Sequence, residues 1–228
     1  LSESGQRGEK LAMLVDEKEN LVRELFHRTR NNMQIVSAII NLQAKKVSDP
    51  EARTGFADAV QRIQAMALVY DQLFQTTQLS RIDLDCYIRQ LALQCRDSLP
   101  ASAGQVEYTF DLVPVSVLFD YAVPCGLVLN ELLCNSYRHA FPQGYQQAVI
   151  KISLKMPEDN VLRIEYHDNG CGMGRITPDD SSDSIGLNLI RGIVENQLKG
   201  RIVFPVSGTG FSCVITFSDS GYAERIKV

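Results

Sequence analysis

The sequence predicts an α+β fold in two parts, an antiparallel helical hairpin followed by a two-layer α/β sandwich. Three observations support this prediction. Apolar residues recur at intervals of three and four through residues 11–47 and 51–75, which is the period of an amphipathic helix. Ser48-Asp49-Pro50 separates these segments and is typical of a helix start. From residue 82 onward, short alternating segments typical of strands are interspersed with apolar helical segments.

The first predicted helix contains the stretch Leu21–Leu42, whose apolar residues fall on one stripe. With one residue upstream, the stripe consists of Leu14, Leu21, Leu25, Ile35, Ile39 and Leu42. The second helix begins after Pro50, with Asp49 as its cap. One hairpin cannot cover this much apolar surface by itself, so we expect a homodimer in which two hairpins form a four-helix bundle. A monomer stays open as an alternative.

The apolar stripe of the first helix is interrupted halfway by Arg28 and Asn32, and His27 lies beside the interruption. These residues belong to the polar cluster His27-Arg28-Thr29-Arg30-Asn31-Asn32. A histidine on an amphipathic helix is most often a partly exposed surface residue. His27 therefore becomes a candidate site residue only when it is considered together with the second part of the chain.

The second part should follow a connector at residues 76–84, which divides the chain into domains 1–78 and 79–228. Helices are expected at residues 85–99, from Pro124 to about residue 140, and at residues 185–198. Strands are expected at residues 82–84, 106–110, 148–155, 161–167, 201–204 and 211–217. The turn residues 157–160 join two of these strands as a hairpin, so we expect a mostly antiparallel sheet.

Composition limits the classes of function. A net charge of −4 and a pI near 5.4 argue against a nucleic-acid-binding protein. The six cysteines form no C-x-x-C pair, which favours buried thiols in a reducing cytoplasm over disulfides or zinc ligands. No signal peptide opens the chain and no apolar run has the length of a membrane span. Because the chain begins with Leu1, we expect it to be the cytoplasmic part of a longer protein, one that could be membrane-anchored.

Two groups of residues in the second part suggest a nucleotide site. The segment Asp168-Asn169-Gly170-Cys171-Gly172-Met173 follows a predicted strand, where glycines allow a flat ligand to approach the backbone and Asp168 can accept a hydrogen bond from an amino group. The same letters are also common in turns. The polar residues 174–184 are expected to form a loop leading to Gly186, at a helix start where backbone N–H groups can bind phosphate.

The second group is the polar stripe Glu131, Asn135 and His139, which recurs every four residues along an apolar helix. The oxygens of Glu131 and Asn135 suit Mg²⁺, and Arg138 and His139 suit phosphate. An ordinary solvated helix face would show the same spacing, so the stripe alone leaves both interpretations open.

Taken together and in this order, the motifs resemble the histidine protein kinases of two-component signalling. The second part is similar to the GHKL ATP-binding fold: NELLCNSYRHAF (Asn130 to Phe141) matches its asparagine-bearing helix. DNGCGM (Asp168 to Met173) and SIGLNL (Ser184 to Leu189) match its glycine boxes, and GTGFSCVITF (Gly208 to Phe217) matches its closing strand. The hairpin resembles that of the HWE-like subfamily, whose phospho-acceptor motif corresponds to the cluster at His27.

The resemblance implies a role for each candidate residue. His27 would be phosphorylated by ATP and would pass the phosphoryl group to an aspartate of a response-regulator receiver domain. An upstream sensor would control this reaction. In the ATP site, Asn135 would bind Mg²⁺, Asp168 would recognise adenine, and Gly170 and Gly172 would admit the nucleotide. Glu131 stands where ATPases of this fold keep a general base, and the residues expected beside the phosphates are Arg138, His139, Gly186 and Leu187.

Three departures from the family pattern matter. Arg28 follows the histidine where more widespread histidine kinases have an acid, which leaves the base unnamed; Glu24, one turn earlier, is a candidate. The second glycine box keeps one glycine, and Phe211 stands where a small hydroxyl residue is common. Two alternatives therefore remain: an ATP-independent phosphotransfer or scaffold protein, and an ATPase in which Glu131 activates water.

Overall fold

The computed structural model describes residues 3–75, 81–97, 106–142, 145, 147–172, 185–205 and 209–219. The chain divides into two compact units, Leu1–Arg81 and Ile82–Val228. The first unit is helical and the second combines helices with strands, in agreement with the predicted fold class.

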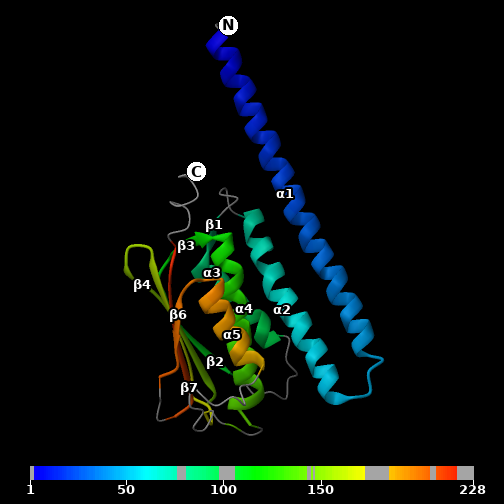
Figure 1. Ribbon diagram of the computed structural model, residues 1–228, viewed down its shortest axis with the longest axis vertical. Helices are drawn as coiled ribbons and strands as arrows, with labels where there is room; N and C mark the ends of the chain where they lie inside the picture. The colour runs from blue at the N-terminus through cyan, green and yellow to red at the C-terminus, as the bar shows by residue number, and fades with distance from the viewer. Residues whose placement is uncertain are drawn as a thin grey trace. The chain divides into compact units, whose positions relative to one another are not determined.

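The first unit consists of two helices, α1 (Glu3–Ala44) and α2 (Pro50–Gln75), which run antiparallel (Figure 1). Asp49 caps α2 as predicted, because its Oδ2 accepts a hydrogen bond from the backbone N–H of Ala52 at 3.0 Å. The rings of Phe26 and Tyr70 meet edge to face across the pair, with centroids 5.8 Å apart. The side chains of Arg30 and Asp71 form an ion pair at 2.5 Å.

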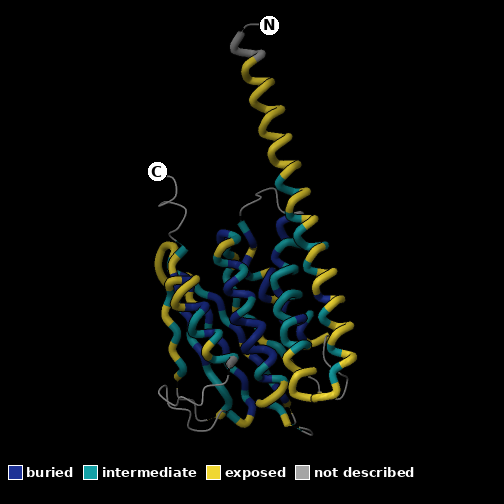
Figure 2. Tube along the Cα trace, turned by 45° about the vertical axis from the view of Figure 1, so that its right-hand side comes forward, coloured by how far each residue is buried: buried dark blue, intermediate teal, exposed yellow. Residues whose placement is uncertain are grey.

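Helix α1 begins at Glu3, well before the predicted start at Leu11. Residues 3–10 include Glu, Gln, Arg and Lys, which favour helix. These residues have no apolar positions at helical spacing, so hydrophobic periodicity does not predict a helix there. Most of the described residues of α1 are exposed, as Figure 2 shows.

The second unit is built on a five-stranded sheet with the order β2-β4-β5-β7-β6. Strands β2 and β4 are parallel, and the other three pairs are antiparallel. Strands β1 and β3 form a separate two-stranded sheet. The bounds of the seven strands are β1 (Arg81–Asp83), β2 (Glu107–Leu112), β3 (Ser116–Leu118), β4 (Val149–Glu158), β5 (Val161–Asp168), β6 (Arg201–Val203) and β7 (Phe211–Ser218).

Three helices, α3 (Leu84–Asp97), α4 (Phe119–Asn135) and α5 (Ile185–Asn196), lie on one face of the large sheet (Figure 1). Every second residue of β5 and of the first half of β4 is buried, as expected for a sheet with one covered face. The buried set is Ile150, Ile152, Leu154, Leu162, Ile164, Tyr166 and Asp168. The predicted two-layer α/β arrangement is therefore confirmed.

The prediction that Pro124 opens its helix is wrong. Helix α4 begins at Phe119 and contains Pro124. Proline there removes one backbone hydrogen bond close to the helix start, and the helix still buries Ala122, Cys125 and Val128. Beyond Asn135 the chain continues as a π-helical turn, Ser136–Ala140, where the sequence pattern predicts a continuous α-helix.

Of the six cysteines, Cys86 and Cys171 are exposed and the other four are buried. Among the described residues, no helix has the length and apolarity needed to span a bilayer.

Candidate functional site

His27 lies on the exposed surface of α1. Its Nδ1 lies 3.2 Å from Nδ2 of Asn31, one helical turn further on. The candidate base Glu24 is engaged elsewhere: its Oε1 accepts hydrogen bonds from Nε and Nη2 of Arg28 at 2.9 and 2.5 Å. An amide side chain is thus one polar neighbour of the imidazole.

Two contacts to α2 flank His27 on either side along α1. Phe26 precedes it and packs on Tyr70, and Arg30 follows it and pairs with Asp71. Burial raises the pKa of Asp71, and the positive charge of Arg30 opposes this shift. These contacts fix which side of α1 faces α2 and so help to keep the imidazole on the exposed side.

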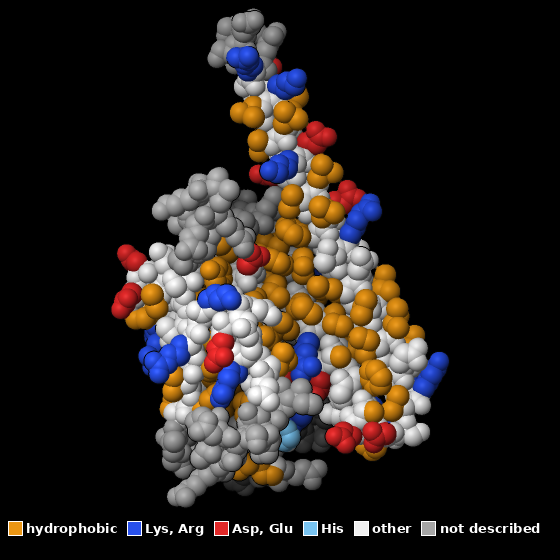
Figure 3. Space-filling view, in the orientation of Figure 1, with side chains coloured by type: hydrophobic (Ala, Val, Ile, Leu, Met, Phe, Trp, Pro, Cys, Tyr) orange, Lys and Arg blue, Asp and Glu red, His pale blue; other side chains and the backbone are white. Residues whose placement is uncertain are grey.

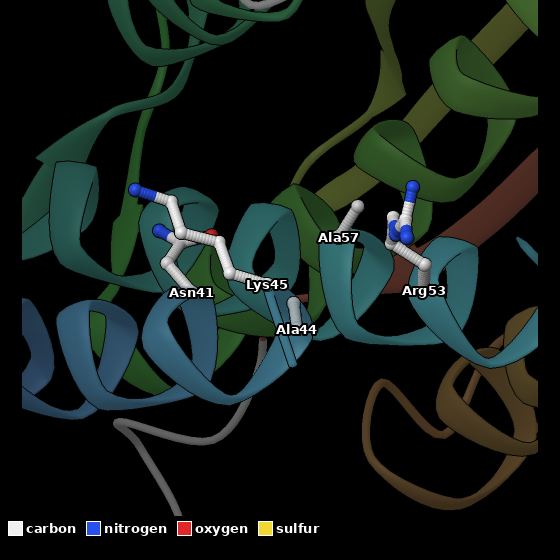
Figure 4. Close-up of a pocket in the computed structure, with 5 residues that line it drawn as sticks. All are labelled: Asn41, Ala44, Lys45, Arg53 and Ala57. Carbon is white, nitrogen blue, oxygen red and sulfur yellow. The ribbon is translucent and has the colours of Figure 1, made fainter. Parts of the chain in front are cut away.

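A pocket of about 590 Å³ lies at the turn between α1 and α2 (Figure 4). Asn41, Ala44 and Lys45 line it from α1, and Arg53 and Ala57 line it from α2. Asn41 is about four helical turns from His27, so this pocket is separate from the candidate phospho-acceptor. Arg53 donates from Nη2 to the carbonyl oxygen of Val47 at 2.9 Å, which gives this arginine a role in the turn itself.

In the second unit, the end of α4 and the start of α5 bring three of the candidate residues together. The missing Cβ of Gly186 would lie 3.5 Å from Oε2 of Glu131 and 3.5 and 3.7 Å from the amide atoms of Asn135. Glu131 is buried and Asn135 is half-buried. Two side chains with hard oxygen ligands thus converge beside a helix N-terminus, a combination suited to Mg²⁺ and phosphate.

The other candidate residues near Glu131 and Asn135 are more exposed to solvent than Glu131 is. Arg138 and His139 are exposed on the π-helical turn, and Leu187 is half-buried on α5. The turn departs from the α-helical repeat that placed Glu131, Asn135 and His139 on one stripe. The carbonyl oxygen of His139 accepts a hydrogen bond from the Cys171 thiol at 3.1 Å, so the backbone of this turn contacts the first glycine box.

Asp168 stands at the end of β5 and is 1% exposed. Its Oδ2 accepts a hydrogen bond from the Ser136 hydroxyl at 2.5 Å. Its Oδ1 accepts from the backbone N–H groups of Gly170 and Phe211 at 3.0 and 3.2 Å. A buried carboxylate that receives three donors is held in one orientation.

Tyr166 extends this network. Its hydroxyl donates to the Ser136 oxygen at 2.8 Å and lies 3.2 Å from the carbonyl oxygen of Leu132. Burial raises the pKa of Tyr166 well above its usual value, and the bond to Ser136 only partly opposes this. The hydroxyl therefore stays protonated. Sequence reasoning missed both Ser136 and Tyr166, although a serine directly after Asn135 and a tyrosine two residues before Asp168 were visible.

The glycines of the first box have structural reasons of their own. A Cβ on Gly170 would lie 2.4 Å from atoms of Ala140, so this glycine lets the box pack against the end of the π-helical turn. Gly172 has φ of +71° and Gly210 has φ of +73°, a backbone region that favours glycine. A Cβ on Gly210 would lie 1.8 Å from the carbonyl oxygen of Asp168, so this contact requires glycine as well.

Asn169 also has a structural role. It donates from Nδ2 to the carbonyl oxygen of Gln147 and accepts at Oδ1 from the N–H of Val149, both at 2.8 Å. Some of the predicted site, namely Met173, the loop 174–184 and Gly208, lies outside the described residues.

Comparison with known proteins defines the class to which the chain is related. Residues 24–99 match the HisKA_2 family, described as histidine kinase. The chain is thus homologous to the sensor histidine kinases, and the predicted relationship to the HWE-like group is confirmed.

Two relatives illustrate this relationship. Sensor histidine kinase PdtaS of Mycobacterium tuberculosis is 30% identical over 186 residues, which cover 81% of this chain and 36% of PdtaS. Blue-light-activated histidine kinase 2 of Erythrobacter litoralis is 22% identical over 191 residues, covering 82% of this chain and 54% of that protein. The chain thus spans just over a third of the length of PdtaS.

The solved histidine kinase domain of the Erythrobacter litoralis EL346 blue-light-activated histidine kinase superposes with a TM-score of 0.66. The match covers 92% of this chain and 98% of that one at 18% identity. The catalytic domain of histidine kinase ThkA matches 61% of this chain and 96% of its own, with a TM-score of 0.50 and 16% identity. These similarities establish the fold, including the GHKL-type sandwich.

Replacing Ser136 with Ala should lower the stability of the second unit by about 2–3 kcal/mol, because a buried carboxylate loses a donor. Tyr166→Phe should cost about 1 kcal/mol, since Ser136 still donates to Asp168. Hydrogen exchange at the amides of β5 and β7 measures both effects within the second unit. A loss in Tyr166→Phe equal to that in Ser136→Ala would contradict the importance of the Ser136–Asp168 bond.

Proposed function

We propose that this chain is the kinase region of a sensor histidine kinase, which transfers the γ-phosphoryl group of ATP to His27. The observation that supports the proposal most strongly is the convergence of Glu131 and Asn135 beside Gly186. The exposed imidazole of His27 on a separate helical unit supplies the acceptor. The homology to sensor histidine kinases supports the same conclusion.

Different residues of the second unit would bind the Mg²⁺ ion, the adenine base and the phosphates of ATP. Asn135, with Glu131 beside it, would hold Mg²⁺, whose charge neutralises the phosphates when it is bound. Asp168 would accept a hydrogen bond from the adenine amino group, since its oriented Oδ2 has a second lone pair beyond the one used by Ser136. Gly186 and Leu187 would present the start of α5 to the phosphates, and Arg138 and His139 are open to solvent beside them.

Glu131 can act in either of two ways. In the kinase it would polarise the incoming imidazole, and in an ATPase it would activate water. The burial of Glu131 beside Asn135 suits both roles, so the fate of the phosphoryl group decides between them. After transfer to His27, the group would pass to an aspartate of a response-regulator receiver domain.

His27→Gln should abolish the alkali-stable, acid-labile label that ³²P-γ-labelled ATP leaves on the protein, while ATP binding measured by calorimetry persists. His167→Gln is the matched control, because His167 lies on β5 with its ring bonded to Ser212 and should keep the label. Label that persists in His27→Gln would refute the assignment of the acceptor. Release of phosphate without label on the wild-type protein would favour the ATPase.

A second copy of the chain is the proposed partner of α1. Positions spaced alternately by three and four residues run from Leu11 to Leu42 without a break, which is a heptad pattern. The apolar members are 52–64% exposed: Leu11, Leu14, Leu21, Leu25, Ile35, Ile39 and Leu42. Figure 3 shows hydrophobic side chains along the described part of α1.

Polar residues occupy the remaining positions of this pattern, Lys18, Arg28 and Asn32. Apolar residues at such positions pair identical helices, and a polar residue among them fixes the register of the pair at a cost in stability. The pattern thus favours a homodimer over a monomer, with the polar positions on either side of His27 in the sequence.

Ile35→Lys should weaken self-association by about tenfold or more, because it places like charges in the seam between two copies. Sedimentation velocity over a range of concentrations measures this. Gln34→Lys adds the same charge at an exposed neighbouring position outside the heptad and should leave association unchanged. A wild-type chain that sediments as a monomer at every concentration would contradict the dimer.

A further inference from the structure

Two of the buried cysteines lie close together between α3 and α4, which pack against each other. Cys95 is near the end of α3, Cys134 is near the end of α4, and a hydrogen bond links the two thiols. The two residues are 5% and 7% exposed, whereas Cys125 and Cys213 are 1% and 0% exposed. The pair therefore combines neighbouring sulfur atoms with some access from solvent.

The surroundings of the two thiols include residues of the π-helical turn that follows α4. The positive charge of Arg138 acts on both thiols. The hydroxyl of Tyr137, which is bonded to that of Tyr108 at 2.8 Å, is an electrostatic neighbour of Cys95. The hydrogen bond from Cys134 lowers the pKa of Cys95, burial opposes this shift, and the charge of Arg138 supports it. Cys95 therefore loses its proton more readily than an ordinary thiol, and the thiolate is the form that reacts with oxidants.

We propose that Cys95 and Cys134 are a peroxide-sensitive thiol pair, whose reversible disulfide couples oxidation to the nucleotide site. The S–S bond is about 2.05 Å long, much shorter than a hydrogen-bonded contact between two sulfur atoms. Its formation therefore draws the end of α4 toward α3. The next two residues of the chain are Asn135, the proposed ligand of Mg²⁺, and Ser136, which bonds to Asp168. The effect on the nucleotide rests on the proposed function, whereas formation of the disulfide does not.

The oxidation balances in two steps. The Cys95 thiolate attacks one oxygen of hydrogen peroxide, the O–O bond breaks, and the departing hydroxide takes up a proton, which leaves a sulfenic acid on Cys95. The sulfur of Cys134 then attacks the Cys95 sulfur, the S–O bond breaks, and the departing hydroxide takes the Cys134 proton. The two thiols together lose two electrons, and the peroxide is reduced to water. A dithiol reverses the reaction by thiol–disulfide exchange.

Peptide mapping of the wild-type chain before and after treatment with hydrogen peroxide tests the pair directly. Cleavage by trypsin and by a protease specific for glutamate places Cys95, Cys125 and Cys134 in separate peptides. We expect the peptides of Cys95 and Cys134 to be joined after treatment and to separate again with dithiothreitol. Peptides that stay unjoined, or that are joined only to other cysteines, would overturn the inference.

Titration calorimetry with ATP and Mg²⁺ measures the coupling to the nucleotide site. The oxidised wild-type chain should bind ATP about tenfold or more weakly than the reduced chain, because displacements of about 1 Å in a site have effects of this size. Dithiothreitol should restore the affinity. Equal affinity in the oxidised and reduced chains would overturn the coupling. Absence of ATP binding in the reduced chain would refute the proposed function instead, while the peptide map would still decide whether the disulfide forms.

Two variants separate this pair from the other cysteines. Cys95→Ser removes one partner of the disulfide and should make ATP affinity insensitive to peroxide. Cys213→Ser, a change at a buried cysteine of β7, should keep the wild-type response. A response that persists in Cys95→Ser would overturn the inference, because it would arise at another residue such as the exposed Cys171.

Discussion

The hydrogen bond from Ser136 to Asp168 is the contact on which the candidate nucleotide site depends. Ser136 opens the π-helical turn that follows α4, and Asp168 ends β5. Their bond joins the helical layer to the sheet at one point. Backbone N–H groups of Gly170 and Phe211 complete the coordination of the carboxylate, so α4, β5 and β7 are held together by one buried charge. The cost of burying that charge is offset only while all three donors are present.

The same junction positions the neighbouring chemistry. Asn135 directly precedes Ser136, so a bond that fixes Ser136 also fixes the end of α4 that carries Asn135 and Glu131. Gly186 allows α5 to begin close beside these side chains. Gly170 likewise allows the backbone to approach Ala140 closely, and Gly210 allows it to approach Asp168 closely. The glycines of the two boxes, together with Gly210 of the closing-strand motif, thus serve packing at the junction as well as any ligand.

Much of this architecture was predictable from local sequence. The long helices, the cap at Asp49 and the β4–β5 hairpin follow from periodicity and turn residues, which act over short distances. The parallel pairing of β2 with β4 depends on contacts far apart in sequence, and β3 is too short to show a pattern. Pro124 misled the prediction because tertiary burial of α4 outweighs its local preference. Within the site, residue types identified Asn135 and Asp168, whereas Ser136 and Tyr166 gained meaning only from their mutual distances.

We propose that the junction of α4, β5 and α5 binds ATP together with Mg²⁺. Titration calorimetry of the wild-type chain with ATP, in the presence and in the absence of Mg²⁺, tests this proposal. We expect saturable binding of one nucleotide per chain that weakens strongly when Mg²⁺ is removed. Absence of binding under both conditions, or binding of equal strength in both, would contradict it.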